Sequence, residues 1–203
     1  MGRPSTFDRE AAVETVMHAI WQNGYEANSV KAMSEKLGIT RSSFYNSFGS
    51  REELFKEVLA TYFDQTPDRA LYGDLSDLPV LVLISRTFRE IVAIRAFDPE
   101  KRGCLAVNCV SELVGHHEEL GPMLGEAVKN SAARFEELLN IAVQRQELPQ
   151  GSDTHGKALA LQNLLVGLSV FAKVLHEEDE LWLMVRTTLE GLGVYREISD
   201  AQV

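Results

Sequence analysis

Apolar residues recur with helical spacing from the start of the chain. The first apolar stripe has the spacing i, i+3, i+4, i+7 and i+8 and consists of Val13, Val16, Met17, Ile20 and Trp21. This spacing places the side chains on one face of an α-helix. Asp8 is a suitable N-cap for this helix, and Gly24 is a suitable stop. The pattern therefore predicts a first helix between these two residues.

Two short helical segments follow the first helix. Ser29 can cap a second helix that ends at Gly38, because glycine readily takes the left-handed conformation that closes a helix. Thr40 offers a new N-cap two residues later. A third short helix is therefore expected over about Arg41–Asn46.

The remainder of the chain is also helical in pattern. Ser50 and Glu53 have the spacing of a capping box and open a fourth helix. From Gln65 to Pro79 the composition changes to Asp, Pro, Gly and Leu, which is typical of a linker. No β-alternation longer than a few residues occurs, so the predicted fold class is all-α with about nine helices. The further helices are expected at about 80–97, 104–114, 120–146, 154–176 and 179–193.

The second and third helices have the form of a helix-turn-helix, joined by the sequence Leu-Gly-Ile-Thr at 37–40. In such a motif the second helix enters the major groove with its N-terminal side chains towards the bases. Arg41, Ser42 and Ser43 are placed to reach base edges and phosphates. The same hairpin also occurs as a simple packing unit, so the spacing alone leaves both interpretations open.

The charge distribution limits where nucleic acid can bind. The formal net charge is −10. Residues 1–51 hold six Lys or Arg against five Asp or Glu, whereas residues 52–203 hold 14 against 25. Because an acidic body repels nucleic acid at long range, any contact with DNA must come from the N-terminal quarter. Within it, residues 36–54 contain Arg41 and Arg51, and the aromatic residues Phe44 and Tyr45 look exposed.

A family resemblance becomes specific in the same part of the chain. The residues that carry it are Phe7-Asp8, Asn23-Gly24-Tyr25-Glu26, Ser29-Val30, Lys36-Leu37-Gly38-Ile39-Thr40, Phe44-Tyr45-Asn46-Ser47-Phe48 and Ser50-Arg51-Glu52-Glu53-Leu54-Phe55. Together they resemble the DNA-binding domain of the tetracycline-repressor (TetR) family. The resemblance implies a homodimeric transcriptional regulator, usually a repressor, that binds a palindromic operator and is released by a small-molecule effector. It also implies a helix-turn-helix DNA-binding domain over residues 1–50 and an effector-binding and dimerisation domain over residues 51–203.

The resemblance and the helix positions together give a set of expected DNA contacts. Hydroxyl groups and free amides at helix starts are general anion-binding positions. The resemblance carries Tyr45 and Arg51 over as phosphate contacts, and Arg41 and Ser42 as base or backbone contacts. The expected DNA-binding residues are Ser29, Lys31, Thr40, Arg41, Ser42, Ser43, Tyr45, Asn46 and Arg51.

The chain departs from the family pattern at two of these positions. Ser47 stands where a histidine is frequent, and Arg51 where a lysine is usual. A serine can still donate to a phosphate, and Arg51 keeps the positive charge. Gly2-Arg3-Pro4 resembles the short basic arm that many members lay against the minor groove, with a terminus lacking fixed contacts as the alternative.

The last two predicted helices, at about 154–176 and 179–193, are apolar around most of their circumference. A helix buried on one side needs an apolar stripe only about 100° wide, so a second buried face is implied. Gly167 would let two backbones approach closely. We interpret the pair as half of a four-helix dimer interface, in keeping with the resemblance, and a deep core within one chain is the alternative.

The middle helices are expected to enclose an effector. Aromatic walls with a few polar anchors are typical of small-molecule pockets, and Arg95 and Glu112 are further polar candidates. The expected ligand-binding residues are Phe63, Phe88, Cys104, Asn108 and Phe135.

Cys104 supports an alternative function. The sequence at 102–105, Arg-Gly-Cys-Leu, resembles a segment in one branch of the family, some of whose members sense electrophiles or oxidants through that cysteine. A thiol in the first turn of a helix, directly after basic residues, can react as its thiolate. A small buried apolar side chain is the other interpretation.

Other functions lack their sequence motifs. No GxSxG, P-loop, GxGxxG, HExxH or CxxC sequence occurs, so neither an enzyme nor a metal site nor a cofactor is expected. A helix-turn-helix protein that binds another protein is the remaining rival. No apolar run is long enough for a membrane helix and no secretion signal precedes the first helix, so the cytoplasm is the expected location and Cys104 and Cys109 are expected as thiols.

Overall fold

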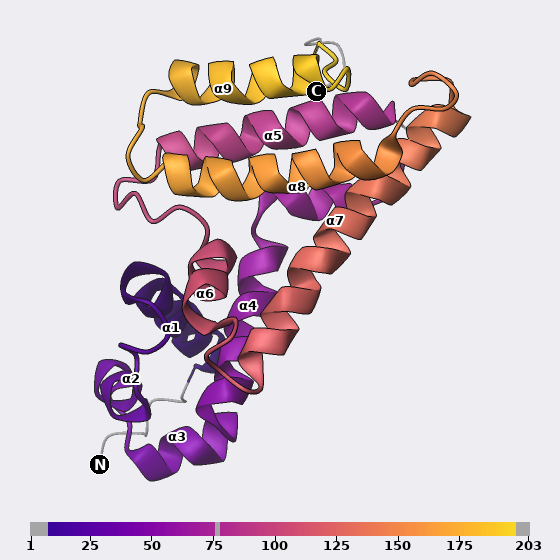
Figure 1. Ribbon diagram of the computed structural model, residues 1–203. Helices are drawn as coiled ribbons and strands as arrows, with labels where there is room; N and C mark the ends of the chain where they lie inside the picture. Colours follow the sequence, from indigo (N-terminus) through magenta and orange to yellow (C-terminus); the bar gives the residue numbers. More distant parts are fainter. Residues whose placement is uncertain (1–7, 76–77, 198–203) are drawn as a thin grey trace.

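The computed structural model describes residues 8–75 and 78–197. Over these residues the chain forms nine α-helices, one 3-10 helix (η1) and no β-strand, which confirms the all-α fold class (Figure 1). The basic segment at 2–4 lies outside the described residues. The elements are α1 (Arg9–Asn23), α2 (Val30–Leu37), α3 (Arg41–Phe48), α4 (Arg51–Asp64), η1 (Pro67–Tyr72), α5 (Val80–Ala96), α6 (Leu105–Leu113), α7 (Leu120–Gln144), α8 (Thr154–Phe171) and α9 (Glu178–Gly191).

The first four helices begin at polar side chains that satisfy free backbone N–H groups. Asp8, Ser29, Thr40 and Ser50 each accept a hydrogen bond from the N–H three residues later, at 3.1, 3.2, 3.1 and 3.0 Å. Gly38 closes α2 in the left-handed conformation, with φ 65° and ψ 28°. The predicted starts of these helices and the turn between α2 and α3 are therefore confirmed.

Three local expectations are corrected. The Glu53 carboxylate pairs with Lys56 at 2.6 Å, whereas the Ser50 N–H donates to a backbone carbonyl, so the capping box is only half formed. The expected linker after Gln65 contains η1, whose Leu71 is buried. Helix α8 ends at Phe171, earlier than expected, because the next residues form hydrogen-bonded turns.

Two buried clusters organise the molecule. The first contains residues of α1, α2, α3, α4, α6 and the start of α7. The second contains residues of η1, α5, the later part of α7, α8 and α9. Helix α7 has 25 residues, a length of about 37 Å, and it runs from one cluster to the other (Figure 1).

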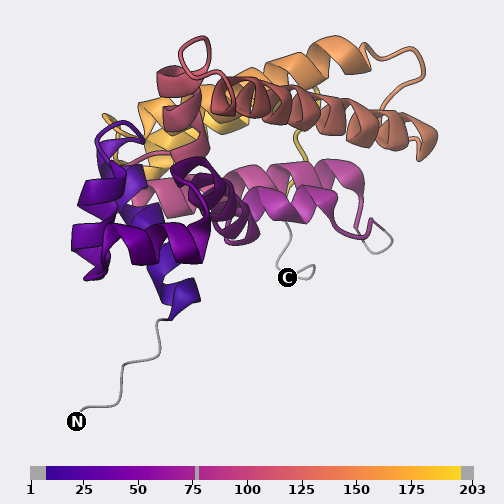
Figure 2. The same ribbon diagram turned by 90° about the horizontal axis from the view of Figure 1, so that it is seen from below.

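The arrangement places the helix-turn-helix at one end of the molecule. Helices α2 and α3 lie at the end opposite α9 (Figure 1), and a view from below shows α1 to α3 gathered beside the start of α4 (Figure 2). Helices α4 and α6 come after the expected domain boundary at residue 50, but their buried residues pack in the first cluster together with those of α1, α2 and α3. The boundary itself stays a prediction.

Candidate nucleic-acid interface and effector cavity

Helix α3 divides into a buried face and an exposed polar face. Phe44 and Phe48 are buried, at 0% and 3% exposure, whereas Tyr45 is 51% exposed. The expectation that Phe44 is exposed is therefore wrong, because its spacing of four residues from Phe48 turns both rings into the first cluster. The exposed face carries the expected DNA-binding residues Thr40, Arg41, Ser42, Ser43, Tyr45 and Asn46.

Helix α2 contributes two further exposed residues to this end of the molecule. Ser29 caps α2 and is exposed, and the Lys31 ammonium lies 3.9 Å from the Glu35 carboxylate on the same helix. An exposed pair at this distance is weak and leaves the lysine available to other anions. Ser29 and Lys31 are therefore exposed on the helix that precedes α3 in the helix-turn-helix.

Arg51 is placed differently from the other expected DNA contacts. Its side chain is 20% exposed, and its guanidinium lies 3.8 Å from the centre of the Tyr25 ring. The guanidinium also donates to the Tyr25 carbonyl oxygen. The Arg51 guanidinium was expected to contact a phosphate. In this structure it instead contacts the carbonyl oxygen and the ring of Tyr25 inside the N-terminal domain.

Tyr25 is the centre of these contacts. Its ring is fully buried, and its hydroxyl donates to a Glu52 carboxylate oxygen at 3.3 Å. Burial raises the pKa of the Tyr25 hydroxyl above its ordinary value, so the group stays neutral. The Glu112 carboxylate, on α6, accepts from the backbone N–H groups of Tyr25 and Glu26, both at 2.8 Å. Glu112 was expected as a polar anchor for a ligand, and instead it ties α6 to the segment before α2.

A second set of contacts ties the start of α6 to α1. The Trp21 indole N–H donates to the Gly103 carbonyl oxygen at 3.2 Å. The Arg102 guanidinium lies 4.0 Å from the centre of the Trp21 ring and pairs with Asp98 at 3.1 Å. These contacts connect the segment before α6 to α1.

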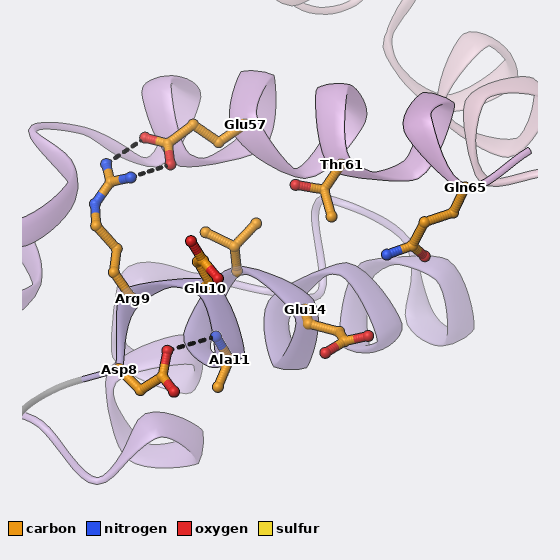
Figure 3. A pocket seen from close by; sticks show the side chains of 9 residues that line it. Asp8, Arg9, Glu10, Ala11, Glu14, Glu57, Thr61 and Gln65 are labelled. Carbon is orange, nitrogen blue, oxygen red and sulfur yellow. Dashed lines mark hydrogen bonds and ion pairs between the residues drawn. The ribbon is translucent and has the colours of Figure 1, made fainter. Parts of the chain in front are cut away.

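A large open hollow of about 710 Å³ lies between α1 and α4 (Figure 3). Arg9 reaches across it to the Glu57 carboxylate, with a distance of 2.6 Å between Nη1 and Oε2. Asp8, Glu10 and Glu14 add further carboxylates. Because its lining is charged and open to water, this groove is a poorer small-molecule site than an enclosed apolar cavity.

A smaller cavity of about 70 Å³ is enclosed by side chains from α4, η1, α5, α6, α7 and α8. Of the expected ligand-binding residues, Phe63 and Cys104 line it, together with Arg95. We regard this cavity as the candidate effector site despite its size, because its walls are mostly apolar and several helices converge on it.

Three expected ligand-binding residues lie elsewhere. Phe88 and Phe135 are both 1% exposed and stack on each other in the second cluster, with ring centres 6.1 Å apart. The Asn108 amide donates to the Arg102 carbonyl oxygen at 2.9 Å. These side chains hold the fold around the cavity and do not line it.

The two cysteines differ in environment. Cys104 is the half-buried N-cap residue of α6, and its sulfur accepts a hydrogen bond from the Tyr62 hydroxyl at 3.3 Å. Cys109 is fully buried, and burial, with a smaller contribution from Glu112, raises the pKa of its thiol to about 12. Cys109 is therefore a neutral apolar side chain at physiological pH.

Helix α8 presents exposed apolar side chains on the side away from the core. Leu159 and Val170 are 51% and 52% exposed, whereas Val166, at helical spacing between them, is half-buried and also lines the candidate effector cavity. A Cβ atom added at Gly167 would meet nothing within 4 Å. On α9, Leu183 is 63% exposed.

The described residues contain neither a metal-binding cluster nor a membrane-spanning helix. No group of three or more His, Cys, Asp or Glu side chains in residues 8–75 and 78–197 is arranged to hold a metal ion. Over the same ranges, none of the helices combines the length and the hydropathy needed to cross a lipid bilayer.

Two protein-family models match the chain. The model described as "Bacterial regulatory proteins, tetR family" matches residues 13–58, which run from α1 into α4. The model described as "Tetracyclin repressor-like, C-terminal domain" matches residues 84–188, from α5 into α9.

Similar proteins cover nearly the whole chain. The HTH-type transcriptional repressor ComR of Escherichia coli is 25% identical over 198 residues, which cover 93% of this chain and 90% of ComR. YezE of Bacillus subtilis, an uncharacterized HTH-type transcriptional regulator, is 29% identical over 196 residues, which cover 95% of this chain and 100% of YezE. A solved structure of a cysteine mutant of the TetR family regulator CifR, complexed with 26-base-pair operator DNA, has a TM-score of 0.81 and 31% identity and covers 93% of this chain and 98% of CifR.

Proposed function

The chain belongs to the TetR family and is a transcriptional regulator, and we propose that it acts as a homodimeric repressor that binds a palindromic operator and is released by a small-molecule effector. The observation that carries this proposal is the exposed polar face of α3 at one end of an otherwise acidic molecule. Residues 1–51 hold six Lys or Arg against five Asp or Glu, so this end offers hydroxyl, amide and guanidinium donors without an excess of carboxylates.

Base contacts are assigned to the first turn of α3. Arg41, Ser42 and Ser43 are exposed there, and the N-terminal residues of a recognition helix are those that meet base edges in the major groove. The Arg41 guanidinium is suited to a bidentate contact with guanine, which is worth about 1–3 kcal/mol of discrimination.

Phosphate contacts are assigned to the residues around that turn. Tyr45 and Asn46 flank the base-reading residues, and Ser29, Lys31 and Thr40 lie at the starts of α2 and α3. We assign Arg51 an indirect role, since it holds Tyr25 and thereby the segment that leads into α2.

Dimerisation is assigned to α8 and α9. The exposed apolar residues Leu159 and Val170 would be buried by the same residues of a second copy, with Gly167 at the closest approach. Two copies of α3 related by this twofold axis would enter successive major grooves about 34–36 Å apart.

Release is assigned to a movement of α6. This helix lines the candidate effector cavity through Val107 and Val110, and it holds the segment before α2 through Glu112. An effector that prefers a shifted α6 by about 1–3 kcal/mol would change the population of the DNA-binding arrangement.

A second candidate function is sensing of electrophiles or oxidants through Cys104. It is favoured by the position of this thiol in the cavity wall and by its hydrogen bond from Tyr62. The test is operator release by an alkylating electrophile. A Cys104→Ser variant that responds as the wild type does would remove this candidate.

The principal experiment is selection of bound duplexes from random DNA, followed by titration of the recovered sequence at several salt concentrations. We expect an inverted repeat, and an affinity that falls steeply with salt because several phosphates are neutralised in each dimer. An Arg41→Ala variant should relax the sequence preference at one position in each half-site. Recovery of no common sequence, with affinity independent of salt, would favour a helix-turn-helix that binds protein.

A further inference from the structure

Arg95 places a positive charge inside the molecule. This residue lies at the end of α5 and is 7% exposed. Its Nη2 group donates to the Tyr62 hydroxyl at 2.9 Å, and its Nε atom is buried without a hydrogen-bond partner. The Trp21 ring centre is 6.0 Å from the guanidinium carbon.

Other poorly exposed arginines are paired with carboxylates, and Arg95 is not. Arg102, Arg134 and Arg89 have distances of 3.1, 2.6 and 2.9 Å to Asp98, Glu137 and Glu178. In residues 8–75 and 78–197 the structure gives Arg95 no ion pair. The charge of Asp68, on the same cavity, acts on Arg95 only from beyond ion-pair distance, whereas a buried charge is normally paired directly.

The unpaired guanidinium lines two adjoining cavities. One is the candidate effector cavity of about 70 Å³, and the other, of about 80 Å³, lies beside Trp21 and Tyr62. The effector cavity has a second unpaired polar atom, the buried Oε1 of Gln162 on α8. Its other walls are mostly apolar, for example Ile91, Val110 and Leu165.

We propose that this cavity binds a small organic carboxylate, with the carboxylate on Arg95 and a short hydrocarbon chain against the apolar walls. This inference rests on the proposed function, since it names the chemical class of the effector. A guanidinium favours a carboxylate over a neutral oxygen because it can donate two parallel charge-assisted hydrogen bonds. The Gln162 amide can turn to donate to the second carboxylate oxygen or to accept from a ligand hydroxyl.

Two features of the cavity set limits on the ligand. Its volume of about 70 Å³ is far below the roughly 300–1,000 Å³ of sites for drug-sized ligands, so short chains are preferred. Asp68, on η1, also lines the cavity, and its carboxylate repels an anion. Since Asp68 is half-exposed whereas Arg95 is buried, water screens the repulsion more than the attraction.

The test is calorimetric titration of the full-length protein, without DNA, with acetate, butyrate and hexanoate and with the primary alcohols of the same chain lengths. We expect at least one carboxylate to bind about tenfold more tightly than its alcohol. Equal affinity of each carboxylate and its alcohol would overturn the proposal, as would chloride binding as tightly as butyrate.

Three variants locate the site. Arg95→Met should weaken carboxylate binding at least about tenfold and change alcohol binding little, because it removes the charge and keeps an apolar chain. Asp68→Asn should strengthen carboxylate binding. Arg89→Met is the matched control, since Arg89 lies on the same helix and is paired outside the cavity, and it should leave binding unchanged.

Two further measurements distinguish a wrong ligand class from a folding defect and from a failure of the proposed function. If Arg95→Met loses its helical circular dichroism, Arg95→Lys replaces it, and the wild-type comparison of acids with alcohols still decides. Fluorescence anisotropy with operator DNA is measured separately. Operator binding together with no preference for any carboxylate would overturn the ligand class alone, whereas carboxylate binding by a protein that selects no duplex would overturn the proposed function alone.

Discussion

The geometry of the N-terminal domain depends on side chains that hydrogen-bond to the backbone of another element. Glu112 does this for the segment before α2, and its approach is possible only because residue 24 is glycine. A Cβ atom at Gly24 would lie 2.9 Å from a Glu112 carboxylate oxygen, and the residue has φ +82°, which disfavours other residues. The glycine therefore serves both the end of α1 and the contact with α6.

Replacement of Glu112 by Gln tests the strength of this contact. The amide keeps one acceptor but turns an N–H₂ group towards a backbone N–H, so one hydrogen bond to a charged group is lost. We expect the free energy of unfolding to fall by about 1.5–3 kcal/mol in urea titrations. Glu118→Gln, at an exposed position just after α6, is the control and should change it by less than about 0.5 kcal/mol. Equal effects of the two substitutions would exclude a special role for Glu112.

Thr40 allows a similar test at the start of α3. Its hydroxyl oxygen accepts from the Ser43 N–H, so Thr40→Ala should lower the free energy of unfolding by about 1 kcal/mol. Thr40→Ser keeps the oxygen and should retain most of that stability. Thermal unfolding of both variants is the measurement, and a serine variant as unstable as the alanine variant would show that the cap does not stabilise the helix.

Asp98 gives stability that depends on pH. Burial alone would raise the pKa of its carboxyl, but the hydrogen bonds and charge of Arg102 outweigh this effect and hold the pKa below its usual 3.8. A carboxyl with a lower pKa in the folded state stabilises the fold above its unfolded pKa, and this stabilisation is lost as the pH falls through the folded pKa. Asp98→Asn should therefore destabilise the protein at neutral pH, and the difference from the wild type should shrink below about pH 4. Urea titrations across that range measure it, and a constant difference would contradict the assignment.

How far the sequence predicts single residues depends on whether their partners are local. Thr40 and Ser29 act within three residues along the chain, so their caps follow from the sequence. Arg51 meets Tyr25, 26 residues away, and no local pattern reveals that contact. The expectation that Phe44 is exposed could have been avoided, because its spacing of four residues from Phe48 already predicts a shared buried face.

At the scale of elements, α6 and α8 each serve two surfaces. Helix α6 buries Leu105, Cys109 and Leu113 in the first cluster and lines the effector cavity with other residues. Helix α8 buries Leu161 and Leu168 in the second cluster and exposes Leu159 and Val170. The apolar circumference of α8 in the sequence is explained in part by this core and in part by the exposed row assigned to the dimer.

A charge in that exposed row tests the dimer. Val170→Glu should raise the dimer dissociation constant at least about a hundredfold, because it buries an unpaired carboxylate in the proposed interface. Sedimentation equilibrium measures the change. Ile94→Glu is the control, since Ile94 on α5 is similarly exposed, at 47%, outside the proposed interface. A dimer that withstands the first substitution, or a monomer without any substitution, would contradict the assignment.

Elements differ in how well the sequence predicts them. Long periodic segments such as α7 and capped segments such as α2 follow from the sequence, because period and caps are local signals. The 3-10 helix η1 does not, because six residues opened by Pro67 give too short a pattern to separate from a turn. The effector cavity depends on side chains from six elements, so the sequence predicted Phe63, Arg95 and Cys104 there but also Phe88 and Phe135, which lie in the core.

At the scale of the whole molecule, the charge and the two clusters assign separate tasks to the two ends. All of the excess negative charge lies after residue 51, which leaves α2 and α3 as the end that DNA can approach. The other end carries the apolar row on α8 and the second cluster. Helix α6, between them, contacts both the cavity and the segment before α2, so one helix can link effector and operator.

The most direct test is the spacing of operator half-sites. A duplex with the selected inverted repeat is compared by fluorescence anisotropy with duplexes in which five or ten base pairs are inserted at its centre. A rigid dimer presenting two α3 helices should lose at least about a hundredfold in affinity with either insertion, because its recognition helices are held about one DNA turn apart. Affinity that is unchanged by both insertions, and matched by a single half-site, would contradict the proposal that paired recognition helices read the operator.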